Sequence, residues 1–315
     1  MTEYLPEGRR TEDRENKAAL CSVRTVETAG KAGTILEAPC TVCDTSHNLI
    51  VDLGCIKGII PRCEGAIGID DGTTRDIALI SRVNKPVCFK VTGIDKSGAV
   101  PVAVLSRKKA QQEAAENYIS LLKSGDIIPA RVTHLEQFGC FVDIGCGIPS
   151  MIPIDAISVS RITHPSDRFF TGQDIFAVVK GRDSGKICLT HKELLGTWEQ
   201  NAARFSVGET VPGIIRSVEE YGIFVELAPN LAGLAELRPD VAAGDYACVY
   251  IKAIIPEKMK IKLIIVNTSK KSCIKDEPHY FMTGGRIDKW VYSTENSPKY
   301  IASDFTEQQD NHGEN

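Results

Sequence analysis

Apolar and polar residues alternate in short runs through the middle of the chain, and turn-forming residues separate these runs. Such alternation is typical of β-strands that bury one face. Between residues 124 and 192 it predicts five strands, the last two joined as a hairpin across Asp183, Ser184 and Gly185. We expect these strands at residues 126–136, 138–144, 150–154, 174–182 and 186–190.

A longer irregular segment, residues 155–172, separates the third of these strands from the fourth. Five short strands with one such insertion are the pattern of a five-stranded Greek-key barrel, the OB-fold. Residues 124–192 are therefore expected to form one barrel of this kind.

The same unit occurs again further along the chain. The run Phe138–Ile144, Phe-Gly-Cys-Phe-Val-Asp-Ile, returns at Tyr221–Leu227 as Tyr-Gly-Ile-Phe-Val-Glu-Leu. One supersecondary unit has therefore been used at least twice. The second of these copies has a shorter insertion, which predicts a less walled binding cleft. Its strands are expected at residues 209–218, 221–227, 231–237, 246–254 and 260–266.

A weaker copy precedes these two. The run from His47 to Gly54 aligns with Phe138–Gly145, but His47 and Ile50 stand at the two aromatic positions. Residues 106–123 are rich in Ala, Gln, Glu and Lys and contain no Gly or Pro, so they predict a helix capped by Ser106. Residues 192–204 predict a second helical connector, which Gly196 weakens.

The expected fold class is thus all-β: tandem five-stranded OB-fold barrels joined by short helical connectors. The expected segments are an N-terminal polar extension (1–33), a degenerate first repeat (34–107), a helical linker (108–123), a second repeat (124–192), a helical linker (193–205), a third repeat (206–269) and a C-terminal extension (270–315).

The two ends differ in composition from the repeats. The start is polar and charged and is expected to be disordered, as is the acidic end beyond Ser303. Residues 271–303 contain too many aromatic and aliphatic residues for a free tail. They predict a small β-hairpin that turns at Gly284 and Gly285 and packs on the third barrel.

Composition limits the class of protein further. A chain of 315 residues with 43% apolar content is globular and long enough for about two or three domains. No run suits a signal peptide or a membrane span, and the eleven cysteines suit reduced thiols better than a disulfide framework. We expect a soluble cytoplasmic protein that has no membrane partner.

The charge changes which nucleic-acid contacts are expected. A net charge of -4 and a pI near 5.9 argue against a globally basic surface. Aromatic residues held at a fixed place on a small β-domain are nevertheless how sequence-tolerant binders stack single-stranded bases. Binding by this chain should therefore depend more on stacking and less on salt than binding by a basic protein.

Three segments carry a resemblance to a known family. Residues 139–145 (Gly-Cys-Phe-Val-Asp-Ile-Gly), 161–167 (Arg-Ile-Thr-His-Pro-Ser-Asp) and 221–225 (Tyr-Gly-Ile-Phe-Val) resemble the RNA-binding domains of the bacterial small-subunit ribosomal protein S1 family. The resemblance covers residues 34 to about 269. It implies an OB-fold that binds single-stranded RNA, including mRNA, on the face of its second and third strands. It also implies a role in translation on or near the small ribosomal subunit.

The family's stacking aromatics fall on Phe138 and Phe141 in the second repeat and on Tyr221 and Phe224 in the third. Residues three apart on an ideal strand point to opposite faces, so Gly139 and Gly222 are expected to allow a kink that brings each pair to one side. The alternative for the two phenylalanines at 141 and 224 is a place in the core, where Phe is often found.

The chain departs from the family at one position. A histidine that often faces the RNA from the third strand is replaced by Pro61, Pro153 and Glu236, so the affinity of each repeat is expected to be modest. The family's Asp and Arg at the last hairpin map to Asp183 and Lys186. In the third repeat only the cation of that pair remains, as Lys260.

Other basic residues are candidates for phosphate contacts because they flank the aromatics. Taken singly, each is as well explained as a solvated surface charge, and His164 as a residue that braces its loop. The candidates are Arg131, Arg161, His164 and Arg182 in the second repeat and Arg216, Lys252 and Lys262 in the third.

Three other functions remain open. Cys40, Cys43, Cys55 and Cys63 are enough thiols for zinc, although their spacing does not form two tight pairs. An enzyme is disfavoured because the chain has no catalytic or phosphate-binding motif, and no cofactor or small-molecule substrate is expected. A protein-interaction or RNA-processing accessory module is the third possibility, with the first repeat as the docking site.

Overall fold

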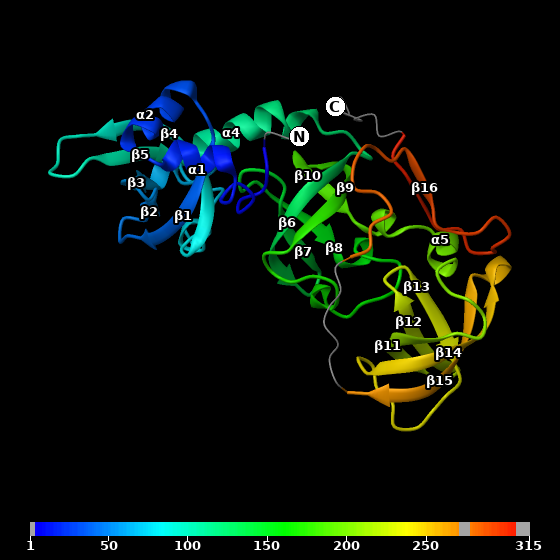
Figure 1. The fold of residues 1–315 in the computed structure, drawn as a ribbon. Coiled ribbons are helices and arrows are strands. Elements are labelled where there is room, and N and C mark those ends of the chain that lie inside the picture. The colour runs from blue at the N-terminus through cyan, green and yellow to red at the C-terminus, as the bar shows by residue number, and fades with distance from the viewer. Residues whose placement is uncertain (1–3, 271–277, 307–315) are drawn as a thin grey trace. The chain divides into compact units, whose positions relative to one another are not determined.

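The computed structural model describes residues 4–270 and 278–306, and these residues contain three closed five-stranded barrels (Figure 1). The predicted fold class, tandem OB-fold barrels with helical connectors, is confirmed. The described part of the chain forms two compact units. One contains the first barrel up to Leu122 together with Pro129–Arg131 and Asp143–Pro149; the other contains the remaining described residues.

The first barrel has the strand order β1-β2-β3-β5-β4, in which only β3 and β5 pair in parallel. Leu36, Leu49, Phe89 and Leu105 are fully or almost fully buried at its centre. Between β3 and β4 lie the short helices η1 (Arg62–Glu64) and α3 (Ile77–Ile80). The strands are β1 (Leu36–Cys43), β2 (Leu49–Asp52), β3 (Lys57–Ile60), β4 (Lys85–Asp95) and β5 (Val102–Ser106).

The expected disorder of the N-terminal extension is wrong for its described residues, which begin at Tyr4. Helices α1 (Arg14–Leu20) and α2 (Val23–Ala32) form there, capped by Asp13 and Ser22. Val26 and Ala29 of α2 are buried in the core of the first barrel. The polar composition hid a short amphipathic helix in which Val23, Val26 and Ala29 pack against that barrel.

The second barrel has the order β10-β8-β7-β6-β9. Helix α4 (Arg107–Asn117) and the turn η2 (Ile119–Leu121) precede it, and Ser106 caps α4 by accepting a hydrogen bond from Lys109 N–H, as predicted. The segment between β8 and β9, which is the insertion of the second barrel, contains the short helices η3 (Ile154–Ala156) and η4 (Pro165–Asp167). The strands are β6 (Ile127–Glu136), β7 (Gly139–Asp143), β8 (Pro149–Pro153), β9 (Asp174–Asp183) and β10 (Lys186–Thr190).

The second connector is divided into η5 (Lys192–Leu195) and α5 (Trp198–Ala202) at Gly196, whose φ of 80° is left-handed. The third barrel then has the order β11-β12-β13-β15-β14, with the turn η6 (Pro256–Lys258) before its last strand. Its strands are β11 (Thr210–Glu219), β12 (Gly222–Ala228), β13 (Leu231–Ala235), β14 (Tyr246–Ile255) and β15 (Lys260–Ser269).

The C-terminal extension forms a small antiparallel pair, β16 (Lys289–Val291) with β17 (Ala302–Asp304). The predicted turn at Gly284 and Gly285 is wrong: residues 292–301 connect the two strands, and the Gly285 carbonyl accepts a hydrogen bond from Ile127 N–H. The predicted disorder beyond Ser303 is also wrong as far as Phe305, which is buried; residues 307–315 lie outside the described residues. No helix in the described residues is long and apolar enough to cross a membrane.

Candidate nucleic-acid interface

An aromatic pair stands on the outside of the second barrel, at the start of β7. Phe138 is 57% exposed and Phe141 is half-buried, so neither ring lies fully in the core. Their ring centres are 5.9 Å apart and their planes are nearly perpendicular, at 88°. Cys140 and Val142, which alternate with Phe141 along the strand, are fully buried in the barrel. The exposed pair offers a face and an edge to a flat ligand.

The third barrel repeats this geometry. Tyr221 is 70% exposed, Phe224 is half-buried, and their rings lie 6.0 Å apart at 87°. Two rings brought together in the same way in two barrels indicate a common use for the surface. We call the pairs Phe138–Phe141 and Tyr221–Phe224 the two aromatic platforms.

A glycine within each platform lies against the third strand. A Cβ at Gly139 would lie 2.6 Å from the Ile152 carbonyl oxygen, and one at Gly222 would lie 2.7 Å from that of Ala235. Gly222 also has a φ of +149°, which disfavours any other residue. This irregularity lets Tyr221 and Phe224 share a side, as the sequence predicted; at Gly139 the close approach of β8 is the dominant constraint.

The first barrel has no equivalent pair. His47, at the first aromatic position, occupies a turn with a φ of 61° and donates its backbone N–H to the Asp44 carbonyl. Ile50, at the second position, pairs with Val42 and Ile59 on the neighbouring strands. The β-framework is therefore kept without a stacking surface at this place.

Lysines flank the platform of the third barrel. Phe224 pairs with Leu234, and Leu234 pairs with Lys262, so these three side chains lie in one row on the outside of the sheet. Lys260 is two residues before Lys262 on β15. Lys252 lies on β14 between Ile251 and Ala253, where the register of β14 with β15 shifts. All three lysines are exposed.

The predicted cations of the second barrel are more dispersed. Arg182, Asp183 and Lys186 are exposed together at the tip of the β9–β10 hairpin, where Lys186 pairs with Asp183. Arg161 is exposed in the insertion. Arg131 lies against the N-terminal segment, since a Cβ added to Gly8 would be 2.9 Å from its guanidinium carbon.

Two predicted contact residues have structural partners. His164 caps η4: its Nδ1 accepts a hydrogen bond from Ser166 N–H at 3.1 Å, which fits the alternative that it braces the loop. Arg216 is paired with Glu226 through Nε (2.9 Å) and Nη2 (3.0 Å) and lies 3.5 Å from Asp167. Burial opposes its charge, but these carboxylates raise the pKa of Arg216. The structure does not place Arg216 with the platform cations.

The ion pair of Arg216 belongs to a junction between the second and third barrels. The buried Glu226 also binds Arg168 of the insertion, at 2.5 Å. Nearby, the buried Asn230 accepts a hydrogen bond from Val159 N–H and donates to the carbonyls of Lys192 and Gly196. These contacts connect the insertion and the second connector to the β12–β13 turn, and both aromatic platforms lie in this one compact unit.

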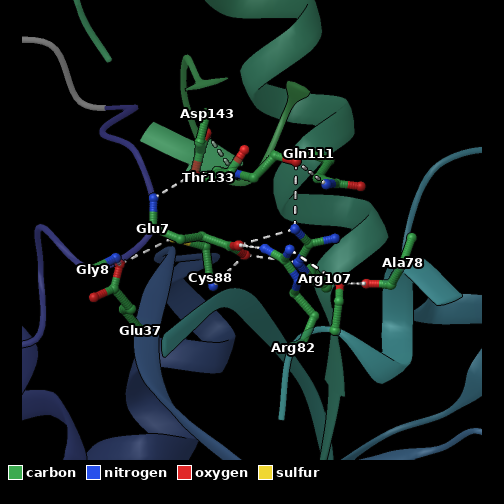
Figure 2. A network of polar contacts seen from close by, with 12 residues as sticks. Glu7, Gly8, Glu37, Ala78, Arg82, Cys88, Arg107, Gln111, Thr133 and Asp143 are labelled. Atoms are coloured by element: carbon green, nitrogen blue, oxygen red, sulfur yellow. Dashed lines mark hydrogen bonds and ion pairs between the residues drawn. The ribbon is translucent and has the colours of Figure 1, made fainter. Parts of the chain in front are cut away.

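A buried polar network organises the other unit (Figure 2). The Glu7 carboxylate accepts hydrogen bonds from Arg107 at 2.7 and 3.0 Å and from Cys88 N–H at 3.1 Å, and Arg82 lies 3.3 Å away. Glu7 N–H donates to Asp143 at 2.7 Å. Burial opposes ionisation of Glu7, but Arg107 and Arg82 outweigh it and hold its pKa below the usual range. Because the network is buried, its role is structural.

The four cysteines considered for zinc, Cys40, Cys43, Cys55 and Cys63, do not form a metal-binding cluster in the described residues. Cys40 is buried in the barrel core, where burial raises its pKa to about 11, whereas Cys63 is exposed on η1. Among residues 4–270 and 278–306, no group of three or more His, Cys, Asp or Glu side chains is arranged to hold a metal ion.

Sequence reasoning missed one ring beside the second platform. His134, on β6, has its ring centre 6.4 Å from that of Phe141, with 32° between the planes. The repeat could have indicated this ring, because His134 corresponds to Ser217 of the third repeat, and Ser217 pairs directly with Phe224 on the neighbouring strand.

Comparison with known proteins gives a family match for the second barrel. Residues 121–192, which include the second barrel, match the S1 RNA binding domain family. The chain is 30% identical over 275 residues to the small ribosomal subunit protein bS1 of Leuconostoc lactis, an alignment that covers 82% of this chain and 62% of the relative. It is 29% identical over 196 residues to bS1 of Staphylococcus aureus strain COL, covering 60% and 48%. The chain thus spans about half to two thirds of these relatives' length.

A solved structure, a multidomain protein with nucleic acid binding domains from Streptococcus pneumoniae, aligns with 75% of this chain and 74% of its own length. The identity is 12% and the TM-score 0.25, so the description of the fold rests on the strand pairing given above. The five-stranded barrels and the family match agree on the fold. Residues 121–192 thus match the S1 RNA binding domain, and the chain as a whole is similar to bacterial small ribosomal subunit proteins bS1.

Proposed function

We propose that the chain is a non-catalytic protein that binds single-stranded RNA, including mRNA, and acts in translation on or near the small ribosomal subunit in the cytoplasm. The observation that carries this proposal is the aromatic platform, built twice with the same ring geometry on barrels of one type. The match of residues 121–192 to the S1 RNA binding domain and the kinship with bS1 proteins support it.

In the proposed mechanism, aromatic rings stack on the RNA bases and basic side chains contact the phosphates. Bases stack on Phe138, Phe141, Tyr221 and Phe224, and each stacked base contributes about 1–3 kcal/mol. The exposed cations of the second and third barrels contact the phosphates, and Asp183 offers a hydrogen-bond acceptor at the tip of the β9–β10 hairpin. These cations are Arg161, Arg182, Lys186, Lys252, Lys260 and Lys262.

Two platforms in one compact unit should bind a continuous strand more tightly than either platform alone. Once the first platform is occupied, the second binding event is intramolecular, and its effective concentration is high. A short RNA that reaches one platform should therefore bind weakly, and one that reaches both should bind tightly.

The test is a fluorescence-anisotropy titration of labelled single-stranded RNA, matched duplex RNA and single-stranded DNA. Wild type is compared with Phe138→Ala/Phe141→Ala/Tyr221→Ala/Phe224→Ala, whose folding is checked by circular dichroism. We expect wild type to prefer single strands and the folded variant to lose at least about 100-fold in affinity, given the worth of each stacked base. Equal binding by both proteins would contradict the proposal.

A second function is favoured for the first barrel, which keeps the β-framework and lacks both rings. We propose that it contacts a protein rather than RNA, as a docking module in the same assembly. Its partner should then stay bound in a pull-down after ribonuclease treatment; loss of the partner on digestion would indicate a bridge of RNA.

A further inference from the structure

A third aromatic ring adjoins the platform of the second barrel. His134 lies on β6 across from Phe141, and its ring is tilted by 32° from that of Phe141 at 6.4 Å. Phe141 also contacts Phe138 edge to face at 5.9 Å. Phe141 therefore contacts both other rings, one on its own strand segment and one on the neighbouring strand.

The fold does not account for His134. Its side chain is 63% exposed, and its hydrogen-bond partner is the exposed carboxylate of Glu136, 2.7 Å from Nε2. An exposed pair of this kind contributes little to stability. The ring instead has properties that suit RNA, because unstacked bases pack on histidine as they do on Phe and Tyr, and imidazole nitrogens also hydrogen-bond to base edges.

The third barrel provides a natural comparison. Its residue at the same place in the repeat is Ser217, which pairs with Phe224 and carries no ring. The two platforms are otherwise alike in ring distance and angle. A functional difference between them should therefore depend in part on this position.

We propose that His134 is a third base-contacting ring of the second barrel, so that this barrel engages single-stranded RNA with one more aromatic residue than the third barrel. The inference rests on the proposed function and refines it. It predicts that the second barrel binds RNA more tightly than the third. Part of this difference in affinity is assigned to His134 on β6, outside the second and third strands of the barrel.

The experiment isolates the second barrel in the full chain by using Tyr221→Ala/Phe224→Ala as the background. His134→Ser is added and the Kd for a labelled single-stranded RNA is measured by anisotropy. Loss of one stacking ring should weaken binding at least about fivefold. His134→Phe restores a ring without the imidazole and should recover most of the affinity.

A charge effect must be separated from stacking. Removing His134 leaves the Glu136 carboxylate unpaired beside the RNA, where it repels phosphate. The comparison is therefore repeated with Glu136→Gln in both proteins, and the fivefold loss should persist. If it disappears there, the carboxylate explains the effect and the inference is overturned.

The reciprocal variant tests the same idea in the other barrel. In the background Phe138→Ala/Phe141→Ala, Ser217→His should strengthen binding of the same RNA by a few fold; an unchanged Kd would count against the inference. Phe138→Ala in the first background separates the two hypotheses. If it weakens binding while His134→Ser does not, the third ring is refuted and the proposed function stands. If neither variant matters, the proposed function fails.

Discussion

Glycines place the aromatic residues of both platforms. In the pairs Phe138-Gly139 and Tyr221-Gly222, the exposed ring precedes a residue that has no room for a side chain, because a carbonyl of the third strand lies close to it. The ring can then stand outside the barrel while the following strand enters the core at Cys140 or Ile223. In each pair, the residue proposed to contact RNA is therefore directly followed by a residue that the barrel needs to fold.

This arrangement predicts that Gly222→Ala destabilises the second unit. The new Cβ would lie 2.7 Å from the Ala235 carbonyl oxygen, and the φ of +149° would be strained. We expect the free energy of unfolding to fall by about 1–3 kcal/mol. The measurement is urea denaturation followed by tryptophan fluorescence, since Trp198 and Trp290 are both buried in this unit.

Gly284→Ala is the matched control, because a Cβ at Gly284 would have nothing within 4 Å and its φ is not left-handed. It should leave the urea midpoint unchanged. Equal midpoints for the two variants would show that the close approach at Gly222 costs the fold nothing.

Single residues also mark where sequence reasoning stops. The repeat predicted the four platform residues because the same residue type recurs at one position of the unit. It could not distinguish Arg216 from Lys262, since both are cations on strands of the third repeat. The structure separates them: Arg216 is neutralised by Glu226, whereas Lys262 is exposed in a row with Phe224.

At the level of elements, the end of β10 connects the second barrel to the C-terminal extension. His191 is 1% exposed; its Nδ1 lies 2.8 Å from the Ile157 carbonyl and its Nε2 lies 3.1 Å from the Tyr280 hydroxyl. A carbonyl only accepts, so Nδ1 carries the proton and Nε2 accepts from Tyr280. The junction thus holds the neutral ring, and burial lowers the pKa of His191 to about 4.

The sign of the pH dependence follows. The unfolded ring titrates near pH 6.5, so between about pH 6.5 and 4 the unfolded chain binds the extra proton. The contribution of His191 is therefore complete above about pH 6.5 and is lost as the pH falls toward 4. For one fully buried ring this amounts to on the order of 3 kcal/mol.

His191→Gln removes the titration while keeping an amide that can donate to Ile157. We expect the variant to lose less stability than wild type between about pH 7 and 4.5, measured as the difference in urea unfolding free energy at each pH. Other carboxylates titrate in both proteins, so the difference between the two is the readout. Parallel curves would show that His191 is not the titrating group.

The barrel strands and both connectors were predictable because strand alternation and helix capping are local signals. The terminal elements were not. Helix α2 is held by the burial of Val26 and Ala29, and Glu7 by Arg107, a partner 100 residues away. The strands β16 and β17 pair across residues 292–301, whereas the sequence favoured Gly284 and Gly285, the stronger local turn signal.

Across the whole molecule, the carboxylate at one position of the repeat makes different contacts in each of the three barrels. Asp52, Asp143 and Glu226 align on the second strand of each barrel; Asp52 and Asp143 end their strands, and Glu226 lies two residues before the end of β12. Asp52 and Asp143 both accept a hydrogen bond from the glycine two residues on, at 2.9 and 2.8 Å. Asp143 also accepts from Glu7 N–H, and Glu226 binds Arg168. The repeat thus supplies connections between segments as well as binding surfaces.

The central claim is that RNA contacts the two platforms. Its most direct test is cross-linking of wild-type chain to single-stranded RNA containing 4-thiouridine, with the modified residues located by mass spectrometry. We predict cross-links at Phe138, Phe141, Tyr221 and Phe224. Phe170, Tyr250 and Tyr300 are exposed aromatics elsewhere and serve as internal controls. Cross-links confined to these controls, with none at the platforms, would contradict the account.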